Sequence, residues 1–313
     1  MRKKKLSNFS NTPLRYPGGK GKITRFVGNI INQNNLHDTY VEPFAGGAGV
    51  AINLLLNGQV DNIIINDLDT SVFAFWKAVT EEPQKLINMI EDVPFDYTDH
   101  AERMTTEERY LYWQKVRSNL NFYRLSDGDH GIQEAFYFFV ANRINVSGIV
   151  KGGPIGGKKQ NGKYNISSRM NKQHLINRII RISEHADQII VKNLEATELI
   201  KLFSDGKLTS REHSLMFVDP PYYSQGRALY SSFMTDALHR MIAKELANSL
   251  NLNWILTYDT APQIRELYAD TNVVQELYKI QYSANKRGRF NEFLFHSPNI
   301  RVSSFENVDL MEI

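Results

Sequence analysis

Short apolar runs alternate along the chain with segments in which hydrophobic residues recur every three or four positions. Runs of branched and aromatic residues predict strands at 38–44, 62–66, 188–192, 215–218 and 254–258. Periodic segments predict helices at 23–31, 50–56, 72–79, 195–203, 235–250 and 262–268. Strands that alternate with helices are typical of an α/β protein with a parallel sheet. The last two runs, 274–283 and 290–296, predict a C-terminal β-hairpin with a basic tip at 284–289.

The alternation stops near residue 95, where the pattern becomes helical. We expect a helix from Thr105 to Leu125, with Thr105 or Thr106 as its N-cap and Glu107 and Glu108 in its first turn. A second, strongly apolar helix is expected over 131–144. A helical block that interrupts an α/β pattern indicates an inserted domain. We therefore expect a catalytic domain made of 1–92 and 186–313, and an inserted domain made of 93–185.

The apolar run 215–218 ends in Asp219, Pro220, Pro221 and Tyr222. Proline fixes its own φ and cannot donate to a sheet ladder, so these groups are presented rigidly at the carboxyl end of a strand. Open α/β sheets bind their ligands at that edge. Asp219 and the carbonyl of Pro220 can accept the two N–H bonds of an exocyclic base amine, and Tyr222 can stack on the ring. These four are the predicted catalytic residues; the competing interpretation is a turn and a helix cap.

A glycine-rich turn leads from the first strand into the helix at 50–56. Its glycines allow the backbone to approach a ligand closely. Asp67 ends the next strand about 20 residues later, which is the spacing at which a carboxylate reaches ribose hydroxyls. Ile52 stands where a dinucleotide fingerprint has its third glycine, so a nucleoside cofactor other than nicotinamide dinucleotide is favoured. Near the N-terminus, Pro-Gly-Gly and Lys20 precede a helix, a pattern that fits either an anion site or a surface turn.

Charge is unevenly distributed along the chain. The formal net charge of the 313 residues is +3, yet the segment from Arg143 to Arg181 holds nine Lys and Arg residues and no acid. Such segregation indicates a phosphate-binding face. Five glycines make 151–164 a loop or hairpin that can enter a DNA groove, although a flexible solvated loop has the same composition. The predicted DNA-binding residues are Arg143, Lys158, Lys159, Lys163, Asn165, Ser168 and Arg169.

Composition narrows the chemistry further. The hydrophobic content of 42% and charged content of 23% are those of a globular protein. The absence of cysteine excludes disulfides, thiolate zinc sites and attack on a pyrimidine through a thiolate. The basic residues at 2–5 are followed by no apolar signal core, and no run of about 18 apolar residues is present. We expect a cytoplasmic protein.

Six motifs, taken in order, resemble those of the Dam-like (alpha-class) DNA adenine-N6 methyltransferases. They are Tyr16-Pro-Gly-Gly-Lys20, Val41-Glu-Pro-Phe-x-Gly-Gly-x-Gly49, Asn66-Asp67, Asp219-Pro-Pro-Tyr222, Tyr258-Asp259-Thr260 and Asn291-Glu292-Phe293-Leu294. The resemblance covers nearly the whole chain. It implies a Rossmann-like domain that uses S-adenosyl-L-methionine (AdoMet) and an inserted, mainly helical target-recognition domain. It also implies a double-stranded DNA substrate with a flipped adenine, and a monomer or weak dimer of prokaryotic or phage type.

The same resemblance implies which residues hold AdoMet. These are Tyr16, Lys20, Phe44, Ala45, Gly46, Gly49, Asp67 and Asp219, with Glu195 as a further candidate for the adenine of the cofactor. The segment 144–163 departs from the family pattern, so the recognition sequence is not implied. Three alternatives remain open: methylation of cytosine N4, nucleic-acid binding without turnover, and, more distantly, a nicotinamide dehydrogenase.

Overall fold

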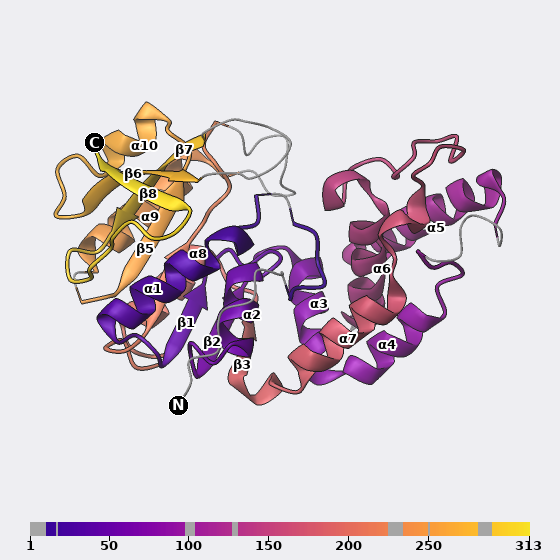
Figure 1. The fold of residues 1–313 in the computed structure, drawn as a ribbon, viewed down its shortest axis with the longest axis horizontal. Coiled ribbons are helices and arrows are strands. Elements are labelled where there is room, and N and C mark those ends of the chain that lie inside the picture. The colour runs from indigo at the N-terminus through magenta and orange to yellow at the C-terminus, as the bar shows by residue number, and fades with distance from the viewer. Residues whose placement is uncertain are drawn as a thin grey trace. The chain divides into compact units, whose positions relative to one another are not determined.

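The computed structural model describes residues 11–16, 18–97, 104–126, 131–224, 234–249, 251–280 and 290–313. The chain folds into two compact units (Figure 1). Unit 1 takes in Lys20–Leu68 and Leu194–Ile313, and unit 2 takes in Asn11–Gly19 and Asp69–Asn193. The predicted basic hairpin tip at 284–289, the basic residues 2–5 and Pro17 lie outside the described residues. No described helix is both long enough and apolar enough to cross a membrane.

An eight-stranded sheet carries the candidate site, in the order β3-β2-β1-β4-β5-β7-β6-β8. The strands are β1 (Thr39–Glu42), β2 (Asn62–Asn66), β3 (Ile189–Lys192), β4 (Leu215–Val218), β5 (Trp254–Tyr258), β6 (Val274–Ile280), β7 (Phe290–His296) and β8 (Val308–Glu312). Parallel pairing joins β2 to β1, β1 to β4 and β4 to β5, whereas β7 is antiparallel to β5 and β6, and β8 to β6. The order 3-2-1-4-5 is that of the Rossmann fold, so the predicted class is confirmed.

The central strands are short and lie in the core of the sheet. Every residue of β1, β4 and β5 is buried, as expected for parallel strands covered on both faces. Unit 1 also contains a short 3₁₀ turn and five helices: η1 (Gly21–Ile23), α1 (Thr24–Asn34), α2 (Gly49–Leu56), α8 (Ala196–Ser204), α9 (Asp236–Asn248) and α10 (Pro262–Leu267). Met216 and Val218 share a core cluster with Phe203 of α8 and Leu246 of α9. This packing fixes the direction in which β4 delivers Asp219.

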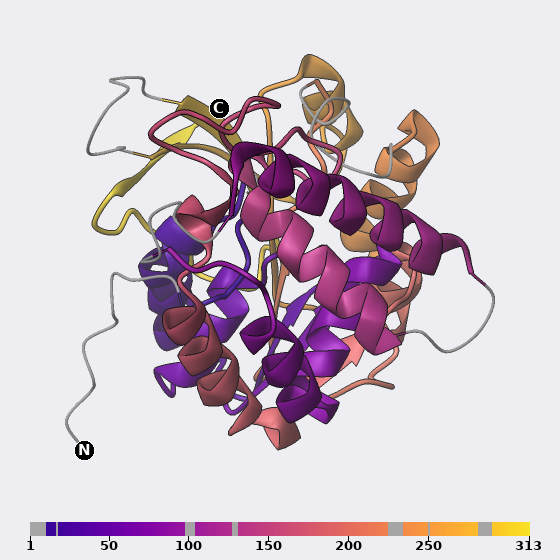
Figure 2. The same cartoon turned by 90° about the vertical axis from the view of Figure 1, so that its right-hand side faces the viewer.

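Unit 2 is mainly helical (Figure 2). Its helices are α3 (Thr70–Glu81), α4 (Pro83–Glu91), α5 (Thr106–Leu125), α6 (Gly131–Ile144) and α7 (Lys172–Ser183), with short 3₁₀ turns η2 (Val146–Gly148), η3 (Ile166–Arg169) and η4 (Ala186–Gln188). Helix α6 forms the centre, where the ring of Phe139 stacks on Phe75 of α3 at 5.7 Å. The predicted cap of α5 is confirmed, because Thr105 and Glu108 form a capping box.

The unit boundaries differ from those expected from the sequence, which were 93 and 185. Helices α3 and α4 pack against α6 and α7, so unit 2 begins at Asp69. It also includes the segment 11–19, since Asn142 of α6 accepts the backbone N–H of Arg15 at 2.9 Å and donates to its carbonyl at 2.6 Å. Within 151–164 the structure has no strand, only an isolated bridge between Asn145 and Pro154. The segment is therefore a loop and not a hairpin.

Candidate active site

Two neighbouring strands deliver the predicted catalytic and cofactor-binding groups to one edge of the sheet. Val41 of β1 pairs with Met216 of β4, and Phe44 and Asp219 each stand three residues further along. The strand order reverses between β1 and β4, and ligands of open α/β sheets bind in the crevice at that point. The glycine turn after β1 and the Asp-Pro-Pro-Tyr segment after β4 therefore leave the sheet beside each other.

Asp219 is held by two donors. Thr257 Oγ1, from the end of β5, donates to Asp219 Oδ1 at 2.6 Å, and Lys20 Nζ lies 3.1 Å from the same oxygen. Burial raises the pKa of Asp219, while the Lys20 ammonium and the Thr257 hydroxyl offset part of that rise. The side chain keeps 22% of its exposure. Both donors contact Oδ1, so the carboxylate is fixed in position. A fixed carboxylate with limited solvent access can orient a neutral amine by accepting its N–H bond.

Lys20 is surrounded by acceptors. Its ammonium lies 3.1 Å from Asp219 and 3.2 Å from Glu292 of β7, and it donates a short hydrogen bond to the hydroxyl of Tyr222. Burial alone would lower the pKa of Lys20, but the two carboxylates outweigh it and the pKa lies above its ordinary value. Burial, followed by the charge of Asp219, raises the pKa of Tyr222 far above its ordinary value, so the phenol stays protonated. Pro220 is buried and Pro221 half-buried.

The glycine turn after β1 is held by hydrogen bonds to the residues at the end of β2. Gly46 has φ 46°, in the left-handed region, and its N–H donates to Asp67 Oδ2 at 2.8 Å. The Ala45 N–H donates to the carbonyl of Asn66 at 2.8 Å, and Gly49 is the first residue of α2. The structure thus brings Ala45, Gly46 and Asp67 together at the ends of β1 and β2, as the sequence predicted for a ribose-binding acid.

A buried carboxyl lies below this turn. Glu42, the last residue of β1, accepts hydrogen bonds from the Tyr40 hydroxyl at 3.0 Å and the Ala51 N–H at 3.1 Å. Burial raises the pKa of Glu42 to about 8, and these two hydrogen bonds lower it only in part. The sequence shows Glu42 as part of a motif, but its burial depends on the packing of β1 against α2.

Further residues shape the edge, and sequence reasoning assigned them no role. Asn66 donates to the carbonyls of Pro43 and Leu194 and accepts the Leu194 N–H, which fixes the chain before Glu195, an exposed residue at the start of α8. Asp259 accepts the N–H groups of Tyr223 at 3.1 Å and Ser224 at 2.8 Å, which fixes the chain after the Pro-Pro turn. The sequence offered one indication of a role for Asp259, because it is a polar residue directly after a predicted buried strand.

The predicted DNA-binding residues divide into two groups. Lys158, Lys159, Lys163 and Arg169 are exposed. The other three are engaged within unit 2: Asn165 and Ser168 form the capping box of η3, and two guanidinium nitrogens of Arg143 donate to the backbone carbonyl of Arg169, at 2.6 and 2.8 Å. Burial and the neighbouring arginines lower the pKa of Arg143 to about 9.

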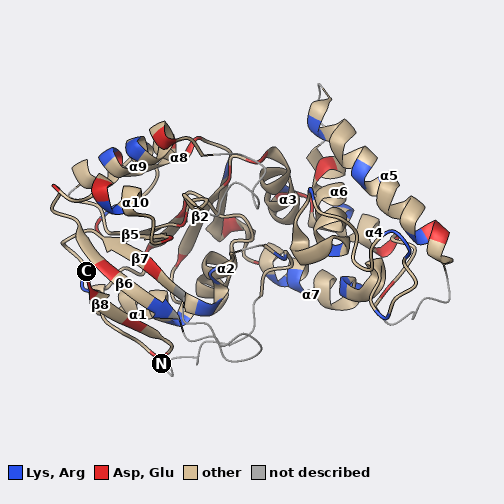
Figure 3. Cartoon of the chain, turned by 90° about the horizontal axis from the view of Figure 1, so that it is seen from above, with Lys and Arg blue, Asp and Glu red and all other residues tan. Residues whose placement is uncertain are grey.

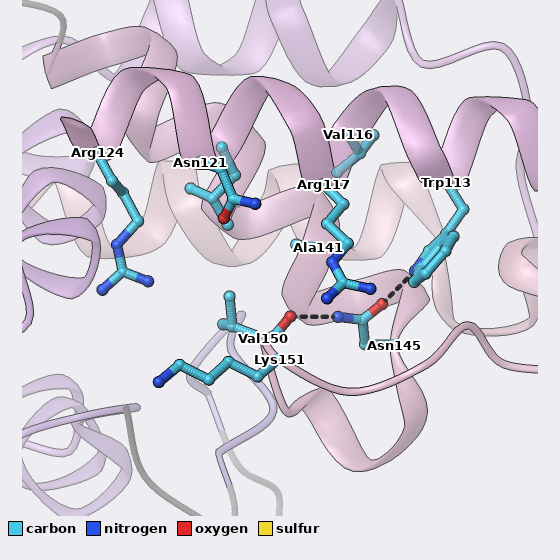
Figure 4. A pocket seen from close by; sticks show the side chains of 10 residues that line it. Trp113, Val116, Arg117, Asn121, Arg124, Ala141, Asn145, Val150 and Lys151 are labelled. Atoms are coloured by element: carbon cyan, nitrogen blue, oxygen red, sulfur yellow. Dashed lines mark hydrogen bonds between the residues drawn. The ribbon is translucent and has the colours of Figure 1, made fainter. Parts of the chain in front are cut away.

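A pocket of about 270 Å³ opens in unit 2 between α5 and the chain at 150–151 (Figure 4). Its apolar wall is formed by Val116, Leu120, Ala141 and Val150, and its polar rim by Arg117, Asn121, Arg124 and Lys151. Arg117 lies over the ring of Trp113, with its guanidinium carbon 5.5 Å from the ring centroid. Asn145 accepts the Trp113 indole N–H at 2.8 Å and donates to the Val150 carbonyl at 2.8 Å, which ties the two walls together. The ten lining residues include no acid.

Figure 3 shows that Lys and Arg recur along α5 and α7, that α5 also carries acidic residues at one end, and that α8, α9 and α10 carry both signs of charge. The pocket rim belongs to this basic part of the chain, although Arg124 is already paired with Asp69 at 2.8 Å. Among the described residues, no group of His, Asp or Glu is arranged to hold a metal ion.

The structure therefore combines a Rossmann-type sheet, an Asp-Pro-Pro-Tyr segment at the switch point of that sheet, and a glycine turn beside it. The chain belongs to the D12 class N6 adenine-specific DNA methyltransferase family, whose model matches residues 16–310. The resemblance to Dam-like enzymes is thereby confirmed.

Two relatives support the same family at low identity. The modification methylase StsI of Streptococcus sanguinis is 24% identical over 247 residues, which are 74% of this chain and 33% of that protein. The type II methyltransferase M.MjaIII of Methanocaldococcus jannaschii is 23% identical over 218 residues, 67% of this chain and 68% of that one. The chain thus spans a third of the first relative. The rRNA methyltransferase AviRa of Streptomyces viridochromogenes aligns with a TM-score of 0.37 at 11% identity, over 91% of this chain and 87% of that one.

Proposed function

We propose that this protein transfers a methyl group from AdoMet to N6 of an adenine at specific sites in double-stranded DNA. The observation that carries the proposal is the setting of Asp219. It is a partly exposed carboxylate at the switch point of the sheet, fixed by Thr257 and Lys20 and followed by a rigid Pro-Pro-Tyr segment. Family membership supports the same activity, and the names of the two relatives support a role in restriction-modification.

The catalytic residues act on the amine by orientation. Asp219 and the carbonyl of Pro220 accept its two N–H bonds, so that the nitrogen lone pair faces the methyl group in line. Tyr222 supports the base through ring stacking, worth about 1–3 kcal/mol per base. The amine nitrogen would form a bond to the methyl carbon, the broken carbon–sulfur bond would leave its electron pair on the sulfur of the departing S-adenosylhomocysteine, and the proton lost from the nitrogen would pass to Asp219 or to water. Because the base must leave the duplex to reach this edge, the enzyme flips it at a cost of a few kcal/mol.

The residues at the β1 and β2 ends fit AdoMet. A left-handed turn at Gly46 and Ala48, with φ 46° and 44°, brings backbone close to the crevice, and Asp67 presents a carboxylate fixed by the Gly46 N–H. Asp67 would hold the ribose, the turn from Phe44 to Gly49 would hold the methionine end, and Lys20 would steady Asp219 between cofactor and base. Bound AdoMet supplies the electrophilic methyl group, so the reaction needs no metal. Tyr16 belongs to unit 2 and keeps its predicted role as a proposal.

The basic part of unit 2 would bind DNA. The exposed residues Lys158, Lys159, Lys163 and Arg169 suit contacts to phosphates, which position a duplex without reading its sequence. The pocket on α5 suits a base edge or phosphate, because Arg117 and Asn121 present donors above an apolar wall. Arg143, Asn165 and Ser168 would act indirectly, since their hydrogen bonds shape the loop that carries the exposed lysines.

The deciding experiment measures tritium transfer from labelled AdoMet to DNA by the wild type and by Asp219→Ala. We expect the wild type to label DNA and the variant to lose transfer while its DNA affinity is largely kept. Binding without transfer by the wild type would instead indicate a nucleic-acid-binding protein on the same scaffold.

Cytosine N4 is the alternative substrate, since it offers the same kind of amine to the same residues. Digestion of the labelled DNA to nucleosides distinguishes the two bases. Label in N6-methyladenosine supports the proposal, and label in N4-methylcytosine replaces adenine with cytosine while leaving the roles of the residues unchanged.

A further inference from the structure

Glu292 is the one acidic residue of strand β7, and nothing in the family name assigns it a role. Its carboxylate gathers three donors. Lys20 Nζ lies 3.2 Å from Oε2, Tyr278 donates a short hydrogen bond to the same oxygen, and the hydroxyl of Tyr222 is also hydrogen-bonded to Glu292. Tyr278 is fully buried and faces Glu292 across the β6–β7 ladder, so it fixes the carboxylate from the neighbouring strand.

The arrangement accounts for every donor of Lys20. An ammonium has three N–H bonds, and here they meet Asp219, Glu292 and Tyr222. Because the Tyr222 oxygen accepts from Lys20, its own proton is directed to Glu292. The orientation of Tyr222 therefore depends on Glu292 through two routes, one direct and one through Lys20.

An ion pair with a purely structural role would not need two carboxylates around one ammonium. One carboxylate would neutralise Lys20, whereas here two carboxylates share it and leave the cluster with an excess negative charge. A half-buried excess charge is costly unless it is fully hydrogen-bonded. Such a cost at the switch point of the sheet favours a functional explanation over a purely structural one.

We propose that Glu292 is the positioning residue of this active site and that it sets the orientation of Tyr222 and Lys20. This inference rests on the proposed methyl transfer. Glu292 touches neither base nor cofactor in the argument; it acts through the two side chains that do.

The charge of Glu292 has a directional effect that a scaffold residue would lack. Burial raises the pKa of Asp219, Lys20 and Thr257 lower it, and Glu292 raises it again. Among the described residues, the other titratable groups that face the cluster are Glu42 and the phenols of Tyr40, Tyr222, Tyr258 and Tyr278. Loss of the Glu292 charge therefore lowers the pKa of Asp219, and it also lowers the pKa of Lys20 by removing one of two counter-charges.

The test compares Glu292→Gln with Glu312→Gln, which removes an exposed carboxylate from β8. Steady-state methylation is measured over a range of pH. For Glu292→Gln we expect kcat to fall about 10- to 100-fold, the loss typical of a misplaced reacting group, with little change in KM for DNA. Both limbs of the kcat profile should move to lower pH. The control should match the wild type in rate and profile.

A Glu292→Gln variant that keeps the wild-type kcat and both limbs overturns the inference, provided that the wild type methylates DNA. A wild type that transfers no methyl group refutes the proposed function instead. If Glu292→Gln does not fold, Tyr278→Phe takes its place, because it frees the carboxylate from β6 without changing any charge. That variant should lower kcat and leave the limbs in place, and an unchanged kcat would refute the positioning role.

Discussion

At the scale of single residues, the candidate site depends on keeping one carboxylate ionised while it is partly removed from water. Burial favours the neutral acid, and the offsetting groups, Lys20 and Thr257, come from opposite ends of unit 1 in sequence. Their convergence on Asp219 Oδ1 leaves Oδ2 for a ligand. The Thr257 hydroxyl at the end of β5 therefore helps to fix the Asp219 carboxylate, although a threonine in an apolar strand carries no such signal in the sequence.

Thr257→Val should move the acid limb of the kcat profile to higher pH. The change keeps the shape of the side chain but removes the donor that lowers the pKa of Asp219. A hydrogen bond to a charged group is worth about 1.5 kcal/mol, so the shift should be about one pH unit. Methylation assays across pH measure it, with the exposed Thr260→Val as control. A limb that stays in place would separate Thr257 from the ionisation of Asp219.

Glu42→Gln should stabilise the protein by an amount that grows with pH. The pKa of Glu42 is about 8 in the folded protein against an ordinary value of 4.5, so between these values the folded state binds more protons than the unfolded state. Stability from this group is therefore full at low pH and is lost as pH rises towards 8, at about 1.4 kcal/mol per unit of the shift. Urea unfolding of both proteins at pH 5 and pH 8 measures the difference. Equal differences at the two pH values would contradict this assignment.

At the scale of elements, the sequence predicted best where one interaction dominates. The strands β2, β4, β5 and β7 and the helix α6 have the predicted bounds, because apolar runs and the absence of competing signals decide them locally. Helix α7 was not predicted: its apolar residues Leu175, Ile179 and Ile182 have helical spacing, but the segment was interpreted only by its basic charge. Helix α4 and strand β8 were also not predicted.

For the candidate site, too, the sequence predicted what local patterns decide and missed what depends on tertiary contacts. The positions of Asp219, the glycine turn and Asp67 follow from strand ends, which a sequence pattern locates. The partners of Lys20 do not, because Asp219 and Tyr222 follow β4 whereas Glu292 lies in β7, and they meet only when the C-terminal antiparallel strands join the parallel sheet. Likewise Arg143, Asn165 and Ser168 have the composition of DNA contacts, and only the structure shows that their donors and acceptors are directed inward.

The loop 151–164 is an ordered element whose shape depends on Gln160. This buried side chain donates to the carbonyls of Ile155 at 2.8 Å and Gly157 at 2.6 Å and accepts the Ile166 N–H at 3.1 Å. Gly156 has φ 84°, and a Cβ there would lie 2.4 Å from the carbonyl oxygen of Tyr164, so only glycine fits. The loop therefore has a defined conformation, in contrast to the flexible alternative that its composition allowed.

Gln160→Ala should open this loop without unfolding the protein. It leaves two carbonyls and one N–H without their partner, each worth about 1–3 kcal/mol if water cannot reach it. Amide exchange within 155–166 should become faster, while the exchange of α6 stays unchanged. Lys159→Ala, at an exposed neighbouring position, is the matched control. Unchanged exchange in 155–166 would show that the backbone alone holds the loop.

At the scale of the whole molecule, the acidic residues of the candidate active site and the basic residues proposed to bind DNA belong to different units. Asp219, Glu292 and Glu42, the acids near the reacting edge, belong to unit 1, whereas the acid-free basic segment from Arg143 to Arg181 belongs to unit 2. Catalysis and DNA affinity should therefore respond to separate sets of substitutions. That separation makes the assignment of DNA binding to unit 2 testable independently of catalysis.

Replacing Lys158, Lys159 and Lys163 with alanine should weaken DNA binding and reduce its dependence on salt. Each lysine that neutralises a phosphate adds about 0.9 to the slope of log K against log salt, because it releases condensed counterions. The control replaces Lys201, Arg240 and Lys244, three exposed cations on α8 and α9, and alters the net charge equally. Titration of a fluorescent duplex at several salt concentrations gives both slopes. A smaller slope in the first variant alone places the phosphate contacts on the loop of unit 2, since a general charge effect would lower both slopes together. Equal slopes in the wild type and the first variant would move the DNA-binding surface away from these lysines and leave the proposed chemistry at Asp219 untouched.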